Sequence, residues 1–305
     1  MKKSGIIAIA GRPNSGKSTL LNRVMSTELS IVSPKAQTTR ERVLGILSEK
    51  EGQIVFIDTP GIHNAKDGGI NEFMMNEVRE ALEGASAIWY LVDPSSAIYH
   101  ESRVIELLKA AGNVPVFLIF NKMDLNKSDE ATQLNLVRFE EEIRQKAVES
   151  GLTVRSVHQI SALKGKGVGE LLAQTWSILP EGPALYPDEE QLSDRPVKFF
   201  VAEKIRQQLL RQLGEEVPYS CAVKVETFKE NVKPVRIEAS IFVERDSQKS
   251  IVIGAAGSKI KAIGTAARGD IEEFLDQKIF LGLQVKVLKD WSRDKNRLKD
   301  LGYAL

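Results

Sequence analysis

Residues 5–25 read GIIAIAGRPNSGKSTLLNRVM, and this stretch decides the fold. Its first six residues are apolar and β-branched enough for a buried strand, and residues 17–27 have the apolar spacing of a helix. Between them, GRPNSGKS (11–18) matches the pattern G-x-x-x-x-G-K-[ST]. A glycine-rich loop between a strand and a helix turns backbone N–H groups and a helix N-terminus towards phosphate oxygens. The stretch therefore predicts a nucleoside triphosphate site in an α/β fold.

Length and composition are those of an ordinary soluble protein. The chain has 305 residues, enough for two domains, with 42% hydrophobic and 27% charged residues. Cys221 is the single cysteine, which excludes an internal disulfide and suits a reducing cytoplasm. No apolar run approaches the ~20 residues that span a bilayer. We therefore expect a cytoplasmic protein.

The first 180 residues alternate between two patterns. Apolar runs at 5–10, 53–58, 87–93, 114–120 and 153–160 predict strands, and amphipathic stretches at 17–27, 70–83, 99–111, 132–149 and 168–178 predict helices. Such alternation predicts a mostly parallel, doubly wound sheet with helices on both faces. The run VLGILSEKEGQIVFID (43–58) instead predicts a hairpin, which places one antiparallel strand at the sheet edge.

Beyond residue 178 the composition changes. Residues 179–196 hold four prolines and no apolar period, which predicts a semi-stiff interdomain linker. Helices at 197–213 and 258–275 and strands at 220–227, 235–244 and 279–288 then predict a compact α+β unit. Residues 1–195 carry 22 Lys+Arg and 26 Asp+Glu, whereas residues 196–305 carry 20 and 15. The basic C-terminal part favours an anionic partner.

Two motifs predict the phosphate chemistry. Lys17 of the glycine-rich loop supplies a positive charge to the outer phosphates, and the Ser18 hydroxyl can ligate Mg²⁺. DTPG (58–61) follows about 40 residues later, at the end of a strand. There Asp58 would hold the magnesium through a water, and the Gly61 N–H would meet a γ-phosphate oxygen.

A third motif, NKMD (121–124), predicts which base is bound. The ionised Asp124 accepts hydrogen bonds only, so it suits guanine, which presents two adjacent N–H donors. Adenine would leave the buried carboxylate unpaired. Asn121 can tie this loop to the phosphate loop, and the Lys122 stem can lie along the purine. SAL (161–163) follows the next strand, where the Ala162 N–H can reach the guanine O6.

The order of these motifs resembles that of the translation-factor-like class of GTPases. The resemblance implies that QTTRERVLGI (37–46) is the first switch segment and that Thr39 supplies a second hydroxyl to Mg²⁺. Thr38 is adjacent, and spacing does not choose between the two. The expected metal ligands are Ser18, Thr39 and Asp58, and the expected catalytic residues are Lys17, Asn14 and Thr39. The expected nucleotide-binding residues are Gly11, Asn14, Ser15, Gly16, Lys17, Ser18, Thr19, Asp58, Gly61, Asn121, Lys122, Asp124, Ser161 and Ala162.

A glycine pair in the C-terminal part predicts RNA binding. Gly254 and Gly257 form a G-x-x-G between an apolar turn (250–253) and the amphipathic helix 258–275, as in loops that clamp single-stranded RNA along its backbone. Small residues matter because a larger side chain would hold the sugar-phosphate away from the protein backbone. The expected RNA-binding residues are Lys249, Gly254, Ala255, Ala256, Gly257, Lys259 and Lys261. Trp291 and Tyr303 have two open interpretations, core packing and base stacking.

Taken together, PNSGKSTLLN, SPKAQTTRERVLGI, FIDTPGIH, NKMDL and VPYSCAVKVETF resemble the bacterial Era GTPase family over essentially the whole chain. This resemblance implies a Ras-like P-loop GTPase domain (1–178), a linker (179–196) and a type II KH domain with a C-terminal helix (197–305). It implies a factor that binds the 3′ end of small-subunit ribosomal RNA and assists maturation of the small ribosomal subunit. It also implies a peripheral association with the inner face of the cell membrane, and no DNA partner.

The residue after DTPG raises the question of mechanism. Ile62 stands where many GTPases carry a glutamine that orients the attacking water, and the family resemblance implies that an apolar residue is normal there. Catalysis would then rest on Lys17, Mg²⁺ and backbone donors, with His63 as a second candidate for orienting water. Resemblance to related GTPases that recruit a K⁺ ion with an asparagine at this place implies a candidate K⁺ site at Asn14. We expect slow GTP hydrolysis to GDP.

Three functions fit this sequence. The first is a GTP-hydrolysing switch whose output is RNA binding. The second is an RNA-binding module that uses GTP mainly as a structural ligand. The third is a related membrane-associated signalling GTPase, which the KH-like C-terminal part disfavours.

Overall fold

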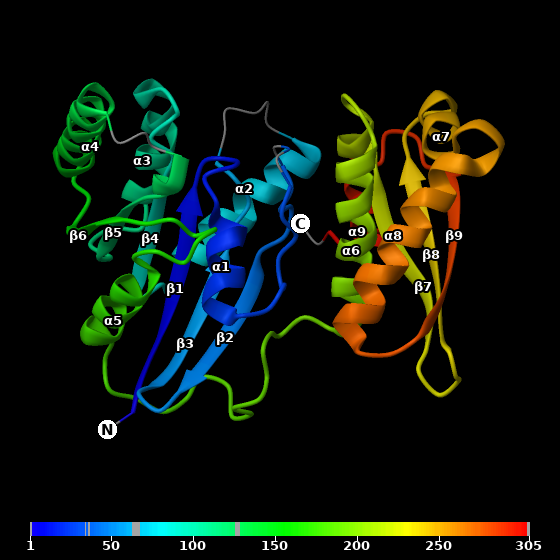
Figure 1. Cartoon of the computed structure of the whole chain (residues 1–305), viewed down its shortest axis with the longest axis horizontal. Helices are drawn as coiled ribbons and strands as arrows, with labels where there is room; N and C mark the ends of the chain where they lie inside the picture. Colours follow the sequence, from blue (N-terminus) through cyan, green and yellow to red (C-terminus); the bar gives the residue numbers. More distant parts are fainter. Residues whose placement is uncertain (1, 34, 36, 63–67, 126–128, 304–305) are drawn as a thin grey trace. The chain divides into compact units, whose positions relative to one another are not determined.

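The computed structural model describes residues 2–33, 35, 37–62, 68–125 and 129–303, which form two compact units (Figure 1). The first unit consists of Met1–Ser30, Thr39–Ala65 and Met74–Asp194. The second consists of Ile31–Thr38, Lys66–Phe73 and Arg195–Leu305. Two short segments from the N-terminal half are therefore grouped with the C-terminal part of the chain.

A six-stranded sheet organises the first unit. Its strands are β1 (Lys3–Gly11), β2 (Val43–Glu49), β3 (Gly52–Asp58), β4 (Ala87–Val92), β5 (Val116–Phe120) and β6 (Val154–Gln159), in the order β2-β3-β1-β4-β5-β6. Every neighbouring pair is parallel except β2 and β3, which form an antiparallel hairpin. The predicted doubly wound sheet with one antiparallel edge strand is confirmed.

Helices cover this sheet. They are α1 (Lys17–Met25), α2 (Gly69–Leu82), α3 (Ser102–Lys109), α4 (Glu130–Glu149) and α5 (Val168–Ile178). Two short 3-10 helices, η1 (Ile98–Glu101) and η2 (Met123–Leu125), lie in the loops that follow β4 and β5. Because parallel strands end at the same edge, the loops after β1, β3, β4 and β5 gather there.

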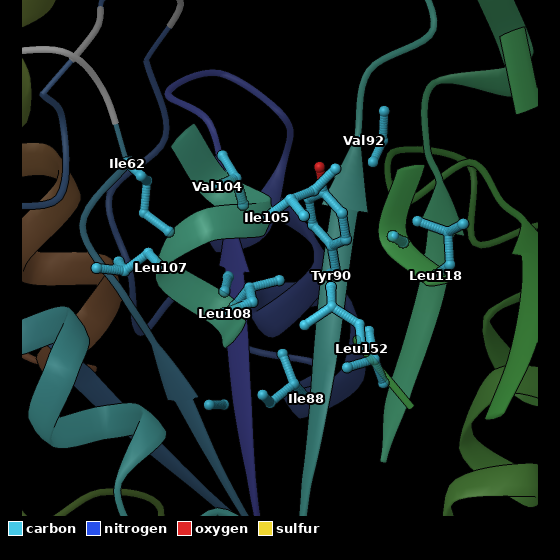
Figure 2. Close-up of a cluster of buried hydrophobic side chains, with 14 of the residues drawn as sticks. Ile62, Ile88, Tyr90, Val92, Val104, Ile105, Leu107, Leu108, Leu118 and Leu152 are labelled. Carbon is cyan, nitrogen blue, oxygen red and sulfur yellow. The ribbon is translucent and has the colours of Figure 1, made fainter. Parts of the chain in front are cut away.

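Side chains of alternating strand positions bury the two faces of the sheet separately. On one face, Ile88 and Tyr90 of β4 pack in a cluster with Val104 and Leu108 of α3 (Figure 2). On the other face, Trp89 is fully buried, and its Nε1 donates to Thr175 Oγ1 of α5 at 3.0 Å. The apolar strands therefore anchor helices on both sides, as their uninterrupted hydrophobicity predicts.

The proline-containing stretch 179–194 lies in the first unit and is bonded to the β2–β3 hairpin. The Tyr186 N–H donates to Gln53 Oε1 at 2.8 Å, and the Leu192 carbonyl accepts from the Ile46 N–H at 2.9 Å. The first unit thus extends past residue 178, where the sequence places the end of its first domain. Prolines suit such a stretch because they fix its backbone without needing an N–H partner.

The second unit has a three-stranded sheet of its own. Its strands are β7 (Ala222–Lys229), β8 (Val235–Val243) and β9 (Ile279–Val287), in the order β7-β8-β9. β7 is antiparallel to β8, and β8 is parallel to β9. Its helices are α6 (Val197–Gln212), η3 (Val217–Ser220), α7 (Asp246–Ile253), η4 (Ala255–Gly257), α8 (Ser258–Leu275) and α9 (Lys295–Asp300). Apolar residues of α6, α7 and α8 share one core with the sheet.

The sequence predicts two helices before the last strand, and the structure adds a third, α7. The sequence predicts a turn for the apolar residues 250–253, but they complete a helix of eight residues. Gln248 stabilises the start of this helix, because its Oε1 accepts from the backbone N–H of the N-cap residue Arg245 at 3.1 Å. Gly254, with φ of 74°, ends it. The helix is too short for its periodicity to stand out in the sequence.

Trp291 and Tyr303 belong to the core of the second unit. Both are buried, their rings stack with centroids 6.0 Å apart, and Trp291 Nε1 donates to the Ser220 carbonyl at 2.9 Å. Phe73 packs on Tyr303 with a centroid distance of 5.5 Å. Of the two interpretations open from the sequence, the geometry favours core packing over base stacking.

Candidate functional site

The phosphate loop joins the end of β1 to the start of α1. Asn14 and Gly16 have φ of 63° and 98°, so the backbone turns in the left-handed region that favours glycine. A Cβ on Gly16 would lie 2.2 Å from Nδ2 of Asn121. Only glycine at position 16 leaves room for the loop that carries Asn121 to approach the phosphate loop this closely.

Lys17 lies buried inside this loop. Its Nζ donates to the carbonyl oxygens of Gly11 at 3.1 Å and Arg12 at 2.8 Å. Burial lowers the pKa of Lys17 to about 8, although the nearby charges of Asp58 and Glu101 raise it. Phosphate oxygens would favour the protonated amine further, so the site is suited to an anion.

Three oxygen-bearing side chains meet beside Lys17. Ser18 Oγ donates to Asp58 Oδ2 at 2.7 Å and lies 3.0 Å from Thr39 Oγ1. Asp58 is fully buried, and its Oδ1 has no hydrogen-bond partner within the described part of the chain. Burial raises the pKa of Asp58, and Lys17 and the Ser18 hydrogen bond oppose that shift. A buried carboxylate oxygen with two hydroxyls fits a hard divalent cation such as Mg²⁺.

The structure distinguishes the two neighbouring threonines. The Thr38 hydroxyl donates to the Lys35 carbonyl at 2.6 Å, whereas the Thr39 hydroxyl faces Ser18. Thr39, not Thr38, therefore belongs to the oxygen cluster. Sequence spacing cannot choose between Thr38 and Thr39, because two adjacent threonines differ only in where their side chains point.

Asn121 connects the base loop to two other loops. Its Nδ2 donates to the Ser15 carbonyl at 2.8 Å, and its Oδ1 accepts from the Ala162 N–H at 2.9 Å. Asp124 Oδ1 accepts from Ser161 Oγ at 2.5 Å. The Ala162 N–H, expected to reach guanine O6, is thus bonded to Asn121 here, and its contact with the base stays a prediction.

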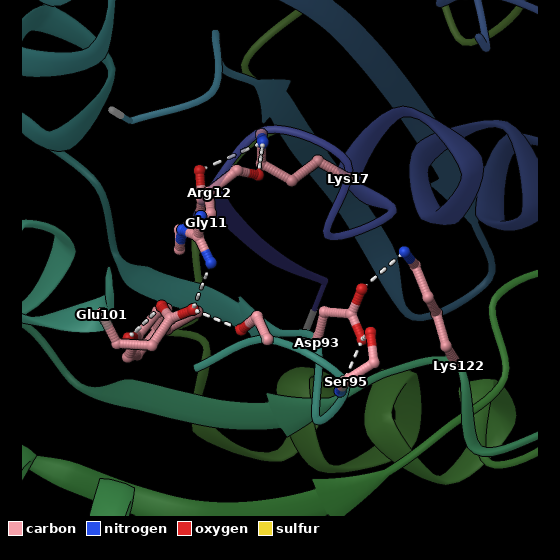
Figure 3. Close-up of polar contacts among 9 residues, drawn as sticks. Gly11, Arg12, Lys17, Asp93, Ser95, Glu101 and Lys122 are labelled. Atoms are coloured by element: carbon pink, nitrogen blue, oxygen red, sulfur yellow. Dashed lines mark hydrogen bonds and ion pairs between the residues drawn. The ribbon is translucent and has the colours of Figure 1, made fainter. Parts of the chain in front are cut away.

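Three charged residues around this site were not identified from the sequence: Arg12, Asp93 and Glu101. Lys122 Nζ donates to Asp93 Oδ2 at 2.6 Å, and Arg12 Nη1 lies 3.9 Å from Glu101 Oε1 (Figure 3). The signal for Asp93 was its place directly after β4, at the edge where the other site residues gather.

Ile62 is part of the hydrophobic core. It is only 1% exposed and packs in the cluster with Val104 and Leu108 of α3 (Figure 2). Its backbone N–H donates to the Gly11 carbonyl at 3.1 Å. The position where other GTPases carry a water-orienting glutamine thus faces the protein interior. His63, the second candidate for that role, lies outside the described residues.

The G-x-x-G stretch lies in the second unit, between α7 and α8. Gly254 and Gly257 have φ of 74° and 77°, and Ala255 and Ala256 between them are exposed. A Cβ on Gly254 would lie 2.9 Å from the backbone nitrogen of Lys259. Residue 254 therefore has no room for a side chain, and the residues that the loop exposes between the two glycines have only small side chains.

The expected lysines surround this loop on the two helices. Lys261 is exposed, and Lys249 and Lys259 are half-buried. Lys259 Nζ donates to the Gln212 carbonyl at 3.5 Å. Because the two alanines carry no charge, attraction of a nucleic-acid backbone to this loop would depend on the neighbouring lysines.

A doubly wound sheet with a phosphate loop and an NKMD loop, followed by a helix–glycine loop–helix unit on its own sheet, defines a GTPase that carries a KH domain. Family models agree: one described as a 50S ribosome-binding GTPase matches residues 6–122, and one described as a KH domain matches residues 216–292.

The chain belongs to the Era family of GTPases. It is 43% identical to GTPase Era of Geobacter sp. (strain M21) over 302 residues, 99% of this chain and 98% of the relative. It is 41% identical to GTPase Era of Staphylococcus haemolyticus over 303 residues, 99% of this chain and 97% of the relative.

Solved structures agree over the whole length. The chain is 37% identical to a single-residue variant of Aquifex aeolicus Era bound to GDP and AlF4⁻, with a TM-score of 0.90 and coverage of 99% of this chain and 100% of the other. It is also 37% identical to an Era in complex with MgGDPNP and nucleotides 1506–1542 of 16S ribosomal RNA. For that structure the TM-score is 0.91, and both chains are fully covered.

Proposed function

We propose that this chain is a GTP-driven switch that binds the 3′ end of small-subunit ribosomal RNA and assists maturation of the small ribosomal subunit. The observation that carries the proposal is its full-length similarity to an Era bound to MgGDPNP and to nucleotides 1506–1542 of 16S ribosomal RNA. The first unit would bind and hydrolyse GTP, and the second would bind the RNA.

The residues of the first unit have separate roles in this proposal. Lys17 and the backbone N–H groups of residues 14–18 bind the phosphates, and Asp124 accepts from the N–H groups of guanine. Ser18, Thr39 and Asp58 would hold Mg²⁺, which neutralises charge on the phosphate oxygens when it is bound. Gly61 lies against the phosphate loop, since a Cβ on it would be 2.6 Å from Pro13 Cα. Its N–H would meet a γ-phosphate oxygen.

The proposal includes slow hydrolysis that K⁺ accelerates. With Ile62 in the core, no side chain at that position orients the attacking water. Asn14, at φ of 63° in the phosphate loop, would hold K⁺ near the phosphates, where its charge stabilises the transition state.

In the second unit, we propose that the Gly254–Gly257 loop clamps the RNA backbone and that Lys249, Lys259 and Lys261 supply charge. The domain limits that go with this proposal are residues 1–178, a connecting stretch 179–196, and residues 197–305.

One feature supports a switch over an RNA-binding module that merely contains GTP. Ile31–Thr38 is grouped with the second unit, where the buried Arg206 donates to the Thr38 carbonyl and the Lys35 amine donates to the Leu213 carbonyl. Thr39, a proposed Mg²⁺ ligand, follows in the chain directly after this anchored segment. A change in Thr39 on hydrolysis would therefore reach the second unit through one peptide bond.

Single-turnover GTP hydrolysis, measured with and without RNA that matches the 3′ end of 16S ribosomal RNA, tests the proposal. We expect that RNA, and not a scrambled RNA of the same composition, changes the hydrolysis rate. Negligible hydrolysis that RNA does not change would instead favour GTP as a structural ligand.

Peripheral membrane contact stays a prediction. None of the helices in the described ranges is long and apolar enough to cross a membrane. Flotation with vesicles of anionic lipid, in GTP and in GDP, tests it: nucleotide-dependent co-flotation would support the contact, and its absence in both states would exclude it.

A further inference from the structure

The loop between β4 and α3 reaches both ends of the nucleotide site. It runs from Asp93, directly after β4, to Glu101, directly before α3. Each of these two carboxylates faces a cationic side chain from a different loop (Figure 3). Asp93 faces Lys122 of the base loop, and Glu101 faces Arg12 of the phosphate loop.

Glu101 is a buried acid with a defined set of partners. It is 1% exposed, accepts from the Tyr90 hydroxyl at 2.8 Å and from Ser96 Oγ at 3.3 Å, and lies 3.9 Å from Arg12 Nη1. Burial raises the pKa of Glu101, and the hydrogen bond from Tyr90 and the charges of Arg12 and Lys17 oppose this shift. A carboxylate in such a place costs folding free energy unless a cation compensates it.

Arg12 in turn belongs to the part of the phosphate loop that holds Lys17. The Arg12 carbonyl accepts from Lys17 Nζ at 2.8 Å. Fixing the Arg12 side chain on Glu101 thus fixes the backbone that positions the lysine. No substrate contact by Glu101 is required for this effect.

Asp93 acts at the other end of the site. Its Oδ2 accepts from Lys122 Nζ at 2.6 Å, and its Oδ1 accepts from the N–H and the hydroxyl of Ser95 at 2.9 and 2.7 Å. Burial opposes ionisation of Asp93, but the hydrogen bonds from Lys122 and Ser95 together lower its pKa. This ion pair restricts the Lys122 side chain of the base loop to one orientation.

We propose that Asp93 and Glu101 are positioning residues for the nucleotide, one for the base loop through Lys122 and one for the phosphate loop through Arg12. One short loop thereby fixes the spacing between the two loops before the ligand arrives, which reduces the ordering cost of binding. This inference rests on the proposed binding of GTP.

Competition titrations on the full chain with a fluorescent GDP test the inference, using GDP and guanosine as the two competitors. Guanosine has no phosphates, so it contacts the base loop only. We expect Glu101→Gln to weaken GDP about tenfold and to leave guanosine unchanged. We expect Asp93→Asn to weaken both competitors by the same factor. Glu106→Gln, which removes an exposed carboxylate paired with Arg103 on the surface of α3, is the matched control and should change neither.

A double-mutant cycle separates positioning from a merely structural role. If Glu101 acts through Arg12, the double variant Arg12→Gln/Glu101→Gln loses no more GDP affinity than either single variant. Additive losses, or an equal loss of guanosine in Glu101→Gln, would overturn the inference. Absence of GDP binding by the unaltered chain would instead overturn the proposed function, so the two failures are distinct. Thermal unfolding of each variant confirms that it is folded.

Discussion

The nucleotide site and the G-x-x-G loop prepare for an anionic ligand in opposite ways. In the first unit the charged groups are buried and hydrogen-bonded within the protein: Lys17 donates to the Gly11 and Arg12 carbonyls, and Asp58 accepts from the Ser18 hydroxyl. In the second unit Ala255 and Ala256 are exposed and uncharged, and the loop offers only backbone between half-buried or exposed lysines. One site depends on fixed side chains, and the other on backbone shape.

This difference teaches where each site is vulnerable. A buried network fails when any member moves, because its groups have no water to replace a lost partner. An exposed backbone loop tolerates changes in its neighbours but not a side chain where the ligand must approach. Substitutions can therefore disable either site and leave the other intact.

The largest expected effect comes from Gly16→Ala. The new Cβ would lie 2.2 Å from Asn121 Nδ2, and the residue would keep φ of 98°, so the phosphate and base loops must separate. We expect GTP affinity to fall at least about a thousandfold, with RNA affinity of the nucleotide-free protein unchanged. Titration with a fluorescent GTP analogue measures this. Gly84→Ala, also at positive φ but with nothing within 4 Å of its Cβ, is the control. Equal binding by Gly16→Ala and the unaltered chain would contradict the role of close approach.

Next in size is the loss of RNA binding in Gly254→Asp. Its Cβ would press on the backbone nitrogen of Lys259 at 2.9 Å, and its charge would repel phosphates. Gly257→Asp, where a Cβ meets nothing within 4 Å, isolates the charge and the strained φ from the clash. In both variants we expect RNA affinity to fall by about a hundredfold or more, with GTP binding intact.

Gly214→Asp adds the same charge in the same unit, where a Cβ also meets nothing within 4 Å, and should bind RNA almost normally. Filter binding at two salt concentrations separates the specific loss from general charge repulsion. Unchanged RNA affinity in either loop variant would defeat the assignment of this loop.

A smaller effect is expected from the cation in the buffer. If Asn14 holds K⁺, GTP hydrolysis in K⁺ should exceed that in Na⁺ by about tenfold, because one added positive charge near the phosphates stabilises the transition state. Asn14→Ala should remove the difference and leave the rate in Na⁺ nearly unchanged. Equal rates in the two salts would exclude a role for K⁺.

The smallest effect concerns stability and pH. The folded protein raises the pKa of Glu101 above its ordinary value, so its contribution to stability is complete below the ordinary glutamate pKa and is lost as pH rises through the raised value. Glu101→Gln should therefore melt a few degrees higher than the unaltered chain at neutral pH, with no gain at acidic pH. Thermal unfolding across pH measures the difference. A variant that melts lower at neutral pH would show that the pairing with Arg12 outweighs burial.

The sequence was most informative where function restricts residue type. The doubly wound sheet, its antiparallel edge strand and α5 at residues 168–178 match the predictions, because long apolar strands and spaced motifs leave few alternative folds. Helix α7 was missed because eight residues give little more than two turns of periodicity. Trp291 and Tyr303 stayed open because an aromatic ring serves a core and a base equally well.

The three charged residues around the nucleotide site could not be identified from the sequence for a different reason. Arg12 occupies a variable position of the phosphate-loop motif, and Asp93 and Glu101 fall in a stretch whose composition is that of any surface loop. Only the fold brings the three to the same site. Thr39 was separated from Thr38 only by the direction of its side chain. A motif predicts residues that would contact a ligand, whereas the residues that hold those side chains in place become visible only in the packed structure.

The burial of Ile62 limits what protein engineering can do with this enzyme. Replacing it with glutamine, to imitate faster GTPases, would place an amide among apolar side chains with no hydrogen-bond partner, at a cost of about 1–3 kcal/mol. The variant would lose stability without gaining an aligned water, since the side chain at this position is buried in the hydrophobic cluster (Figure 2). Faster hydrolysis would instead require a second molecule that binds the GTP-bound form and supplies a group that orients the attacking water. The rate of GTP hydrolysis would then be set by the complex of this chain with its partner and not by the chain alone.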